Sequence, residues 1–202
     1  MLAVALRVEQ ASAAHFSIIA NLEGAPQIGA VNHKILYGTF KFQGDGALFS
    51  LTEKGGYSLL HAFAGDLDGQ YPNAKLAIDA KGGIYGTAPK GGANNAGTVW
   101  EYSAHNGFTA LHSFGNQGDG IFPNQGPTIL DKSTIVGTAS QGAINDNGNI
   151  FSIAAKHNTY TVLYEFLSGN DGHCPFAGVA VSDIGTIYGM TTGLGWGGNP
   201  NG

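Results

Sequence analysis

Short apolar segments alternate along the whole chain with clusters of glycine, asparagine and charged residues. In the clearest stretch the apolar segments are residues 75–79, 84–87, 98–102 and 109–114, and the clusters between them are 81–83, 90–97 and 105–107. Apolar runs of this length between residues that tolerate positive φ are typical of strands joined by turns. The spacing of an amphipathic helix is absent. The pattern therefore predicts an all-β fold of short antiparallel strands.

This unit repeats with a period of about fifty residues, which indicates a propeller, a solenoid or an array. One series consists of Tyr37-Gly38-Thr39, Tyr85-Gly86-Thr87, Val136-Gly137-Thr138 and Tyr188-Gly189-Met190. A second series, in register with the first, consists of Asp68-Gly69 with Pro72, Asp119-Gly120 with Pro123, and Asp171-Gly172 with Pro175. We expect units near residues 27–63, 75–114, 126–166 and 177–202, the last one completed by residues 1–21.

The fourth unit is divided between the two ends of the chain. Its expected strands are residues 178–181, 186–190, 4–10 and 16–21. Such a division arises when a β-propeller closes its ring by pairing its first strands with its last, which also removes exposed sheet edges. We therefore predict a single domain over residues 1–202, a four-bladed β-propeller with four strands per blade and a ring closed by the terminal strands. An open array and a fragment of a larger propeller are the alternatives.

Composition narrows the classes of partner. Charged residues make up 11% of the 202 residues, the formal charge is −5, and nine Lys and Arg residues leave no basic stripe for nucleic acid.

Cys174 is the single cysteine, so a disulfide within the chain is excluded. Arg7 and Glu9 interrupt the apolar N-terminal run, which therefore predicts no clear signal peptide, and no segment is long and apolar enough to predict a membrane span.

The motifs together resemble a known repeat family. Residues 84–87 (Ile-Tyr-Gly-Thr), 97–100 (Gly-Thr-Val-Trp) and 111–114 (Leu-His-Ser-Phe), followed by Asp119-Gly120 and Pro123, resemble the tandem GloVer repeats of bacterial secreted or surface-anchored proteins. The resemblance spans nearly the whole chain and implies a propeller-like module outside the cell, with no catalytic residues to carry over. Three positions depart from the pattern, namely Val136 in place of Tyr, Tyr164 in place of His, and residues 21–26 without the Asp-Gly element.

The long connections are expected at one end of the propeller. Because strands in a blade alternate in direction, the Asp-Gly loops and the glycine-rich loops after Tyr-Gly-Thr share an end, and short hairpin turns such as 52–56 share the other. Long loops on a rigid scaffold commonly carry binding and catalysis. We therefore expect a functional site at the loop-rich end.

The first Asp-Gly loop is a candidate cation site. Asp66 and Asp68 stand one residue apart, and oxygen ligands of this kind suit Ca²⁺. The alternative is that the aspartates accept backbone hydrogen bonds while glycine supplies the turn. No other cofactor is expected.

Aromatic residues of the loop-rich end are candidates for sugar binding. Tyr71, Phe122 and Trp196, with Asp68 beside them, are able to stack on a sugar ring and bond its hydroxyls. Trp196 lies among glycines, outside any expected strand. For Tyr71 and Phe122 the alternative is that their rings fill gaps between blades.

Three residues are candidates for catalysis. Asp119, Asp171 and His173 are the expected acid and base groups of a glycoside hydrolase or lyase, which needs two carboxylates across the reacting bond. Asp171, His173 and Cys174 form a second possible set, either as acid, base and nucleophile or as metal ligands. By contrast, His61 and His112 repeat at one strand position and are interpreted as packing residues. Glu101 and Glu165 fall within strands, so the sequence favours the loop aspartates over them.

Three functions remain open at this point. The leading hypothesis is an extracellular binding module for a glycan or polysaccharide that uses the loop-rich end. A polysaccharide-acting enzyme with loop aspartates from different blades is the first alternative. A structural protein of surface assemblies is the second.

Overall fold

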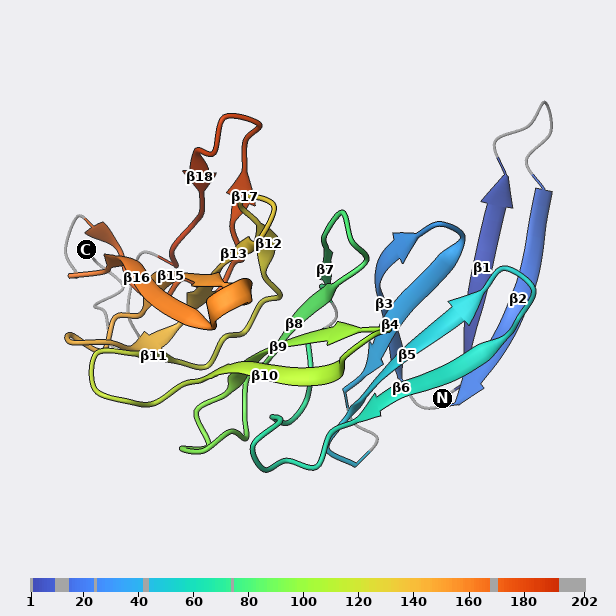
Figure 1. Cartoon of the computed structure of the whole chain (residues 1–202), viewed down its shortest axis with the longest axis horizontal. Helices are drawn as coiled ribbons and strands as arrows, with labels where there is room; N and C mark the ends of the chain where they lie inside the picture. The colour runs from blue at the N-terminus through green and yellow to red at the C-terminus, as the bar shows by residue number, and fades with distance from the viewer. Residues whose placement is uncertain are drawn as a thin grey trace, which may run out of the picture.

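The computed structural model describes residues 2–9, 15–23, 25–41, 44–73, 75–167 and 171–192. These residues form three four-stranded antiparallel sheets in a row, called blades 1 to 3 below, with short two-stranded pairings and hairpins (Figure 1). No α-helix occurs among the described residues, and η1 (Ala155–His157) is a 3-10 turn. The predicted all-β fold is confirmed.

Each blade is a meander in which consecutive strands pair. Blade 1 contains β3 (Pro26–Asn32), β4 (Ile35–Phe40), β5 (Ala47–Thr52) and β6 (Tyr57–Ala62). Blade 2 contains β7 (Ala77–Ile78), β8 (Ile84–Ala88), β9 (Thr98–Ser103) and β10 (Gly107–Ser113). Blade 3 contains β12 (Thr128–Ile129), β13 (Thr134–Ala139), β15 (Asn149–Ala154) and β16 (Thr159–Glu165).

In blades 1 to 3, the glycine of the Tyr-Gly-Thr motif, which reads Val-Gly-Thr in blade 3, lies beneath an aromatic ring of the next strand. A Cβ on this glycine would overlap the ring of its cross-strand partner, and the pairs are Gly38 with Phe49, Gly86 with Trp100, and Gly137 with Phe151. All three rings are fully buried. The motif is therefore a packing device in which glycine leaves room for a large core side chain.

The core lies between neighbouring blades. Phe63 at the end of blade 1 packs edge to face on Trp100 of blade 2, with ring centroids 5.6 Å apart. One blade later, Phe114 meets Phe151 in the same way at 5.2 Å. Because each blade buries its apolar face against the next one, the repeats stabilise each other rather than folding around separate cores.

The threonine of the same motif ties each blade to the chain entering the next. Its hydroxyl donates to a backbone carbonyl, and the bonds run from Thr39 to Asn73, from Thr87 to Gln125 and from Thr138 to Ala177, at 3.0–3.3 Å. All three threonines are buried. The hydrogen bonds therefore join each blade to the segment that leads into the next one.

The expected division of long loops and short turns between two ends is confirmed. The first Asp-Gly loop pairs with the glycine-rich loop of blade 2 through a bridge between Gln70 and Lys90. In the next unit, β11 (Gly120–Ile121) pairs in the same way with β14 (Gln141–Gly142). In Figure 1 the long loops of blade 2 run along the bottom, and the tips of the β7–β8 and β17–β18 hairpins point to the top.

The predicted pairing of the terminal strands is not observed. β1 (Leu2–Glu9) pairs with β2 (His15–Glu23), and β17 (Ala180–Val181) pairs with β18 (Ile187–Tyr188). The two hairpins lie at opposite ends of the row (Figure 1), and no ladder joins them within the described residues. Each hairpin is a two-stranded sheet whose strands pair only with each other, so the outer edges of these strands have no strand partner within the described residues.

Candidate functional site

The Asp-Gly aspartates are engaged by the strand that precedes them. Asp68 accepts from Ala64 N at 3.0 Å and lies 2.9 Å from Nε2 of His61 in β6. Asp119 accepts from Asn116 N at 3.2 Å and lies 3.2 Å from Nε2 of His112.

Tyr164 takes the place of histidine in blade 3. Its hydroxyl donates to Asp171, which also accepts from Leu167 N at 2.8 Å. Each of the three aspartates therefore accepts a hydrogen bond from a backbone N–H at the start of its own loop. This agrees with the interpretation in which the aspartates accept backbone hydrogen bonds while glycine supplies the turn.

The histidines also pack between blades. His61 stacks on Phe108 of blade 2 with centroids 3.7 Å apart, and His112 stacks on Tyr160 of blade 3 at 4.0 Å. Burial lowers the pKa of His112, and the nearby Asp119 carboxylate opposes this shift. The interpretation of His61 and His112 as packing residues agrees with these contacts.

The predicted cation ligands are placed differently from each other. Asp66 has an exposed side chain, and its carbonyl accepts from Gly92 N at 2.5 Å. Asp68 is half-buried and bonded as above. Among the described residues no group of three or more His, Cys, Asp and Glu side chains is arranged to hold a metal. Calcium binding by Asp66 and Asp68 stays a prediction.

The predicted sugar-stacking residues occupy a repeated backbone position. Tyr71 and Phe122 precede the loop prolines with φ of 61° and 57°, and Cys174 takes this position in the third loop with φ of 51°. Their N–H groups donate to the glycine-rich loop of the preceding blade, at Asp45 O, Ala96 O and Asn147 O. Tyr71 and Phe122 are half-buried, as expected of rings that fill gaps. Trp196 lies outside the described residues.

The residues around His173 do not form a hydrogen-bonded catalytic set. Asp171 bonds Tyr164, and both ring nitrogens of His173 are buried without a hydrogen-bond partner among the described residues. Burial raises the pKa of the Cys174 thiol, and Asp146 adds to the shift. A raised pKa disfavours the thiolate that a nucleophile requires.

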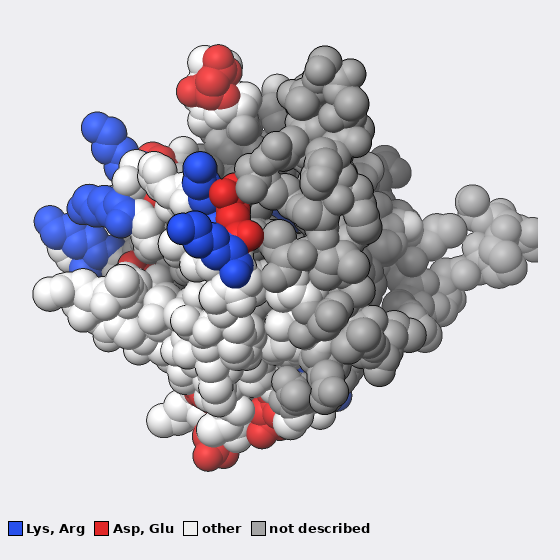
Figure 2. All heavy atoms as spheres, turned by 90° about the vertical axis from the view of Figure 1, so that its right-hand side faces the viewer, with Lys and Arg blue, Asp and Glu red and all other residues white. Residues whose placement is uncertain are grey.

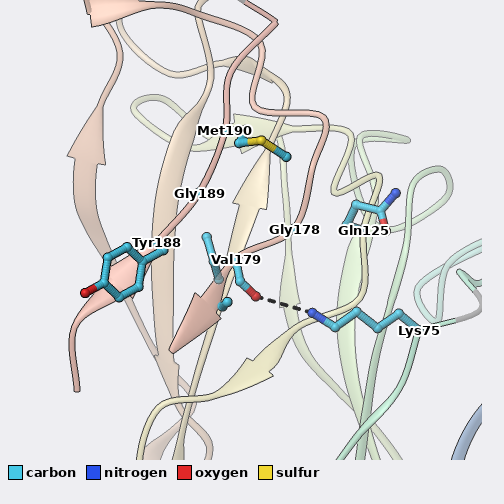
Figure 3. Close-up of a pocket in the computed structure, with 8 residues that line it drawn as sticks. Lys75, Gln125, Gly178, Val179, Tyr188, Gly189 and Met190 are labelled. Atoms are coloured by element: carbon cyan, nitrogen blue, oxygen red, sulfur yellow. Dashed lines mark hydrogen bonds between the residues drawn. The ribbon is translucent and has the colours of Figure 1, made fainter. Parts of the chain in front are cut away.

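One cavity, of about 340 Å³, lies where the inner strands of blades 2 and 3 approach β17. Nζ of Lys75 donates to Thr128 Oγ1 at 2.8 Å and to Val179 O at 3.4 Å (Figure 3). The ring of Tyr188 is 61% exposed and points away from Lys75 (Figure 3). Lys75 therefore acts as a link between blade 2 and the β17–β18 hairpin.

A second, polar cleft of about 450 Å³ lies at the hairpin-turn end, between blades 2 and 3. We call it the hairpin cleft. Its lining residues are Asp79, Lys81, Gly83, Tyr85, Glu101, Ser103, His105 and Asn106 of blade 2 and Lys132, Ser133, Ala155 and Lys156 of blade 3. None of the site residues expected from the sequence lies in this cleft.

A buried tyrosine links two carboxylates in the hairpin cleft. The hydroxyl of Tyr85 lies 3.1 Å from Oδ2 of Asp79 and 3.3 Å from Oε1 of Glu101. Oδ1 of Asp79 accepts from the N–H groups of Lys81 and Gly83, both at 2.8 Å. Burial raises the pKa of Tyr85, and the charges of Glu101 and Asp79 raise it further. The hydroxyl therefore stays protonated, and its single proton is donated to one of the two carboxylates at a time.

Glu101 has no acidic counterpart in the other blades. It pairs across the strands with Tyr85, and the same position in blades 1 and 3 is held by Ser50 opposite Tyr37 and Ser152 opposite Val136. The sequence favours the loop aspartates over Glu101, because Glu101 falls within a strand. The signal that marks it is that blade 2 carries an acid at a position that blades 1 and 3 fill with serine.

The described chain contains no helix of the length and apolarity that a membrane crossing requires.

Several solved structures share the fold at low sequence identity. Virginiamycin B lyase from Staphylococcus aureus matches with a TM-score of 0.57 and 10% identity, over 95% of this chain and 64% of that one. A nidogen/laminin complex matches with a TM-score of 0.53 and 13% identity, over 91% and 66%. TolB from Acinetobacter baumannii matches with a TM-score of 0.50 and 15% identity, over 89% and 44%. The chain thus spans less than two thirds of each of these structures, and they support a propeller-like fold alone.

Sequence comparison identifies the family. No curated protein shows significant similarity to the chain. The model of the Gloeobacter/Verrucomicrobia repeat matches residues 13–201, which include both repeated series of motifs. The predicted resemblance is therefore confirmed, and the chain belongs to the Gloeobacter/Verrucomicrobia repeat family.

Proposed function

We propose that the protein is an extracellular, non-catalytic binding module and that its ligand is a carbohydrate held in the hairpin cleft. The observation that carries this proposal is the convergence of fixed polar groups on a cleft of about 450 Å³, a size typical of ligand sites. Sugar hydroxyls both donate and accept hydrogen bonds. Glu101 and Asp79 supply acceptors, and the lysine and Asn106 side chains supply donors.

The hydrogen bonds made by the candidate catalytic acids favour ligand binding over hydrolysis. Asp119 and Asp171 are held by His112 and Tyr164 of their own blades. In the hairpin cleft, Asp79 accepts from two backbone N–H groups and from Tyr85. Carboxylates engaged in this way orient a ligand more readily than they exchange protons with it. A polysaccharide-acting enzyme stays the alternative.

The test is a glycan array followed by calorimetry with Glu101→Ser. The substitution installs the residue that Ser50 and Ser152 already place at this position, so we expect the fold to be retained. Loss of glycan affinity by tenfold or more would support the proposal. The matched control is Asp66→Ser, which removes the same charge at the loop-rich end and should bind as the wild type does. Unchanged affinity of Glu101→Ser would place the ligand elsewhere, and the loop residues Tyr71, Phe122 and Asp68 would then be tested.

The extracellular location is part of the proposal. It rests on the family resemblance and on a composition that is rich in uncharged polar residues, with 11% charged residues. Fractionation of the native host, with the protein detected by antibody, tests it. Recovery in the cytoplasm alone would contradict it.

We also infer that the β1–β2 hairpin completes a fourth blade with β17–β18. The two hairpins correspond to the outer and inner strand pairs of a blade. Tyr188 is 61% exposed, whereas Tyr85 at the same repeat position is 3% exposed. The inner strands β17 and β18 therefore lack the outer strands that bury the equivalent tyrosine of blade 2. In blade 2, Tyr85 pairs with Glu101. Arg7 is the residue equivalent to Glu101 in the fourth unit, so closure would pair Arg7 with Tyr188.

Cysteine cross-linking tests closure. In a Cys174→Ser background, Arg7→Cys with Tyr188→Cys should form a disulfide within one chain. Disulfide-linked dimers would mean that closure occurs between copies. If no cross-link forms, the row of blades is open and the inference of closure is wrong.

A further inference from the structure

Three lysines surround the hairpin cleft. Lys81 comes from the β7–β8 turn, Lys132 from the β12–β13 turn and Lys156 from η1. Their side chains are exposed, and no ion pair within the described part of the chain neutralises them. By contrast, Lys34 of blade 1 lies 3.9 Å from Glu53. The cleft therefore offers three unpaired positive charges in a protein whose formal charge is −5.

The nearby acids are engaged with other groups. Asp79 and Glu101 contact Tyr85 in the cleft. Asp131, beside Lys132, accepts from the backbone N–H groups of Ser133 and Thr134 at 2.9 Å. The lysine ammonium groups thus keep their donors for a ligand.

The basic side chains are unevenly distributed over the face shown in Figure 2. Figure 2 shows most of the visible Lys and Arg side chains in its upper half, the half in which Figure 1 places the tips of the β7–β8 and β17–β18 hairpins. Asp and Glu side chains lie among them there and also along the lower edge. A negatively charged ligand would therefore be repelled less by the hairpin-turn end, where the acidic side chains lie among lysines, than by the loop-rich end.

We infer that the ligand of the hairpin cleft is an acidic saccharide, one that carries carboxylate or sulfate groups beside free hydroxyls. This inference rests on the proposed carbohydrate binding and specifies its ligand class. The anionic group accepts from Lys81, Lys132 and Lys156, and neighbouring hydroxyls donate to Glu101 and Asp79. A simple anion would use the lysines alone and would gain nothing from the two carboxylates.

The same chemistry argues against a nucleic acid. A polyphosphate backbone needs a long run of cations, whereas this cleft sets three lysines around two carboxylates. A single acidic sugar unit offers its anionic group to the lysines and its hydroxyls to the two carboxylates.

The experiment compares three probes by calorimetry at low salt: an oligogalacturonate, a sulfated chondroitin oligosaccharide and a neutral oligoglucan. We expect the wild type to bind one or both acidic probes at least tenfold more tightly than the neutral probe. Combined Lys81→Gln, Lys132→Gln and Lys156→Gln substitutions should reduce this binding at least tenfold. The matched control, Lys34→Gln with Lys54→Gln and Lys90→Gln, removes the same charge elsewhere and should have little effect. The exposed positions should leave the melting temperature of both triple variants unchanged.

The outcomes separate the two proposals. Equal binding of the acidic and neutral probes, abolished by Glu101→Ser and insensitive to the lysine substitutions, would overturn the acidic specificity and leave the carbohydrate function standing. Binding of inorganic sulfate as tight as that of the acidic oligosaccharides would overturn the role of the sugar. No binding of any saccharide would overturn both.

Discussion

A Cβ atom on Gly97 would lie 2.5 Å from Cδ of Pro123, the proline that ends the second Asp-Gly loop. The same contact joins Gly46 to Pro72 and Gly148 to Pro175, and all three glycines have positive φ. In each case the proline ring packs on the glycine of the preceding blade. Each contact of this kind between neighbouring blades therefore consists of a glycine from a glycine-rich loop and the proline of the next Asp-Gly loop.

Gly97→Ala should destabilise the protein strongly. The residue has φ of 103° and faces Pro123, so the methyl group adds both backbone strain and overpacking, each about 1–3 kcal/mol. Urea denaturation measures the change. Gly107→Ala is the control, because Gly107 also has positive φ but nothing lies within 4 Å of the added Cβ. Equal losses in the two variants would show that the proline contact contributes nothing.

Asp119→Ala should reduce stability rather than remove an activity. The variant loses the contacts with His112 and the backbone of Asn116, and we expect a loss of about 1–3 kcal/mol. Thermal and urea unfolding measure the loss. Asp66→Ala, at an exposed position of the first loop, should change stability little. An Asp119→Ala variant with wild-type stability and abolished turnover of a polysaccharide would instead support the enzyme hypothesis.

Stability should fall as the pH drops below about 6.5, the ordinary pKa of histidine. The pKa of His112 is lowered in the folded protein, so between its lowered value and 6.5 the unfolded chain binds a proton that the folded chain does not. Urea unfolding at pH 7.5 and pH 5.5 measures the difference. His112→Tyr copies the residue of blade 3, keeps a donor for Asp119 and removes the titration, so its stability should depend less on pH. An unchanged pH dependence would exclude His112 as the cause.

Cys174 should resist alkylation in the folded protein. Its thiol is buried and its pKa is raised, and both features suppress reaction with iodoacetamide. Mass spectrometry should find slow modification in buffer and fast modification in urea. Rapid modification of the native protein would restore Cys174 as a candidate nucleophile.

Most strands and the two ends of the blades were predictable from the sequence. Turn clusters mark the strand limits, and alternation of strand direction sorts the connections into long loops and short turns. The candidate site was less predictable. Its acids are separated along the chain, since Asp79 belongs to a turn and Glu101 to a strand, and they meet only because both face Tyr85.

Repetition along the sequence determined the all-β architecture and the contacts that recur in every unit, because glycine, proline and aromatic residues must return wherever one blade packs on the next. The tertiary structure decided which polar groups share a cleft and whether the terminal hairpins meet. These outcomes depend on how the blades are placed in space, and the local pattern of a strand or turn does not encode that placement. Three separate turns bring Lys81, Lys132 and Lys156 around one opening, and only the packing of blade 2 on blade 3 sets the distance between them.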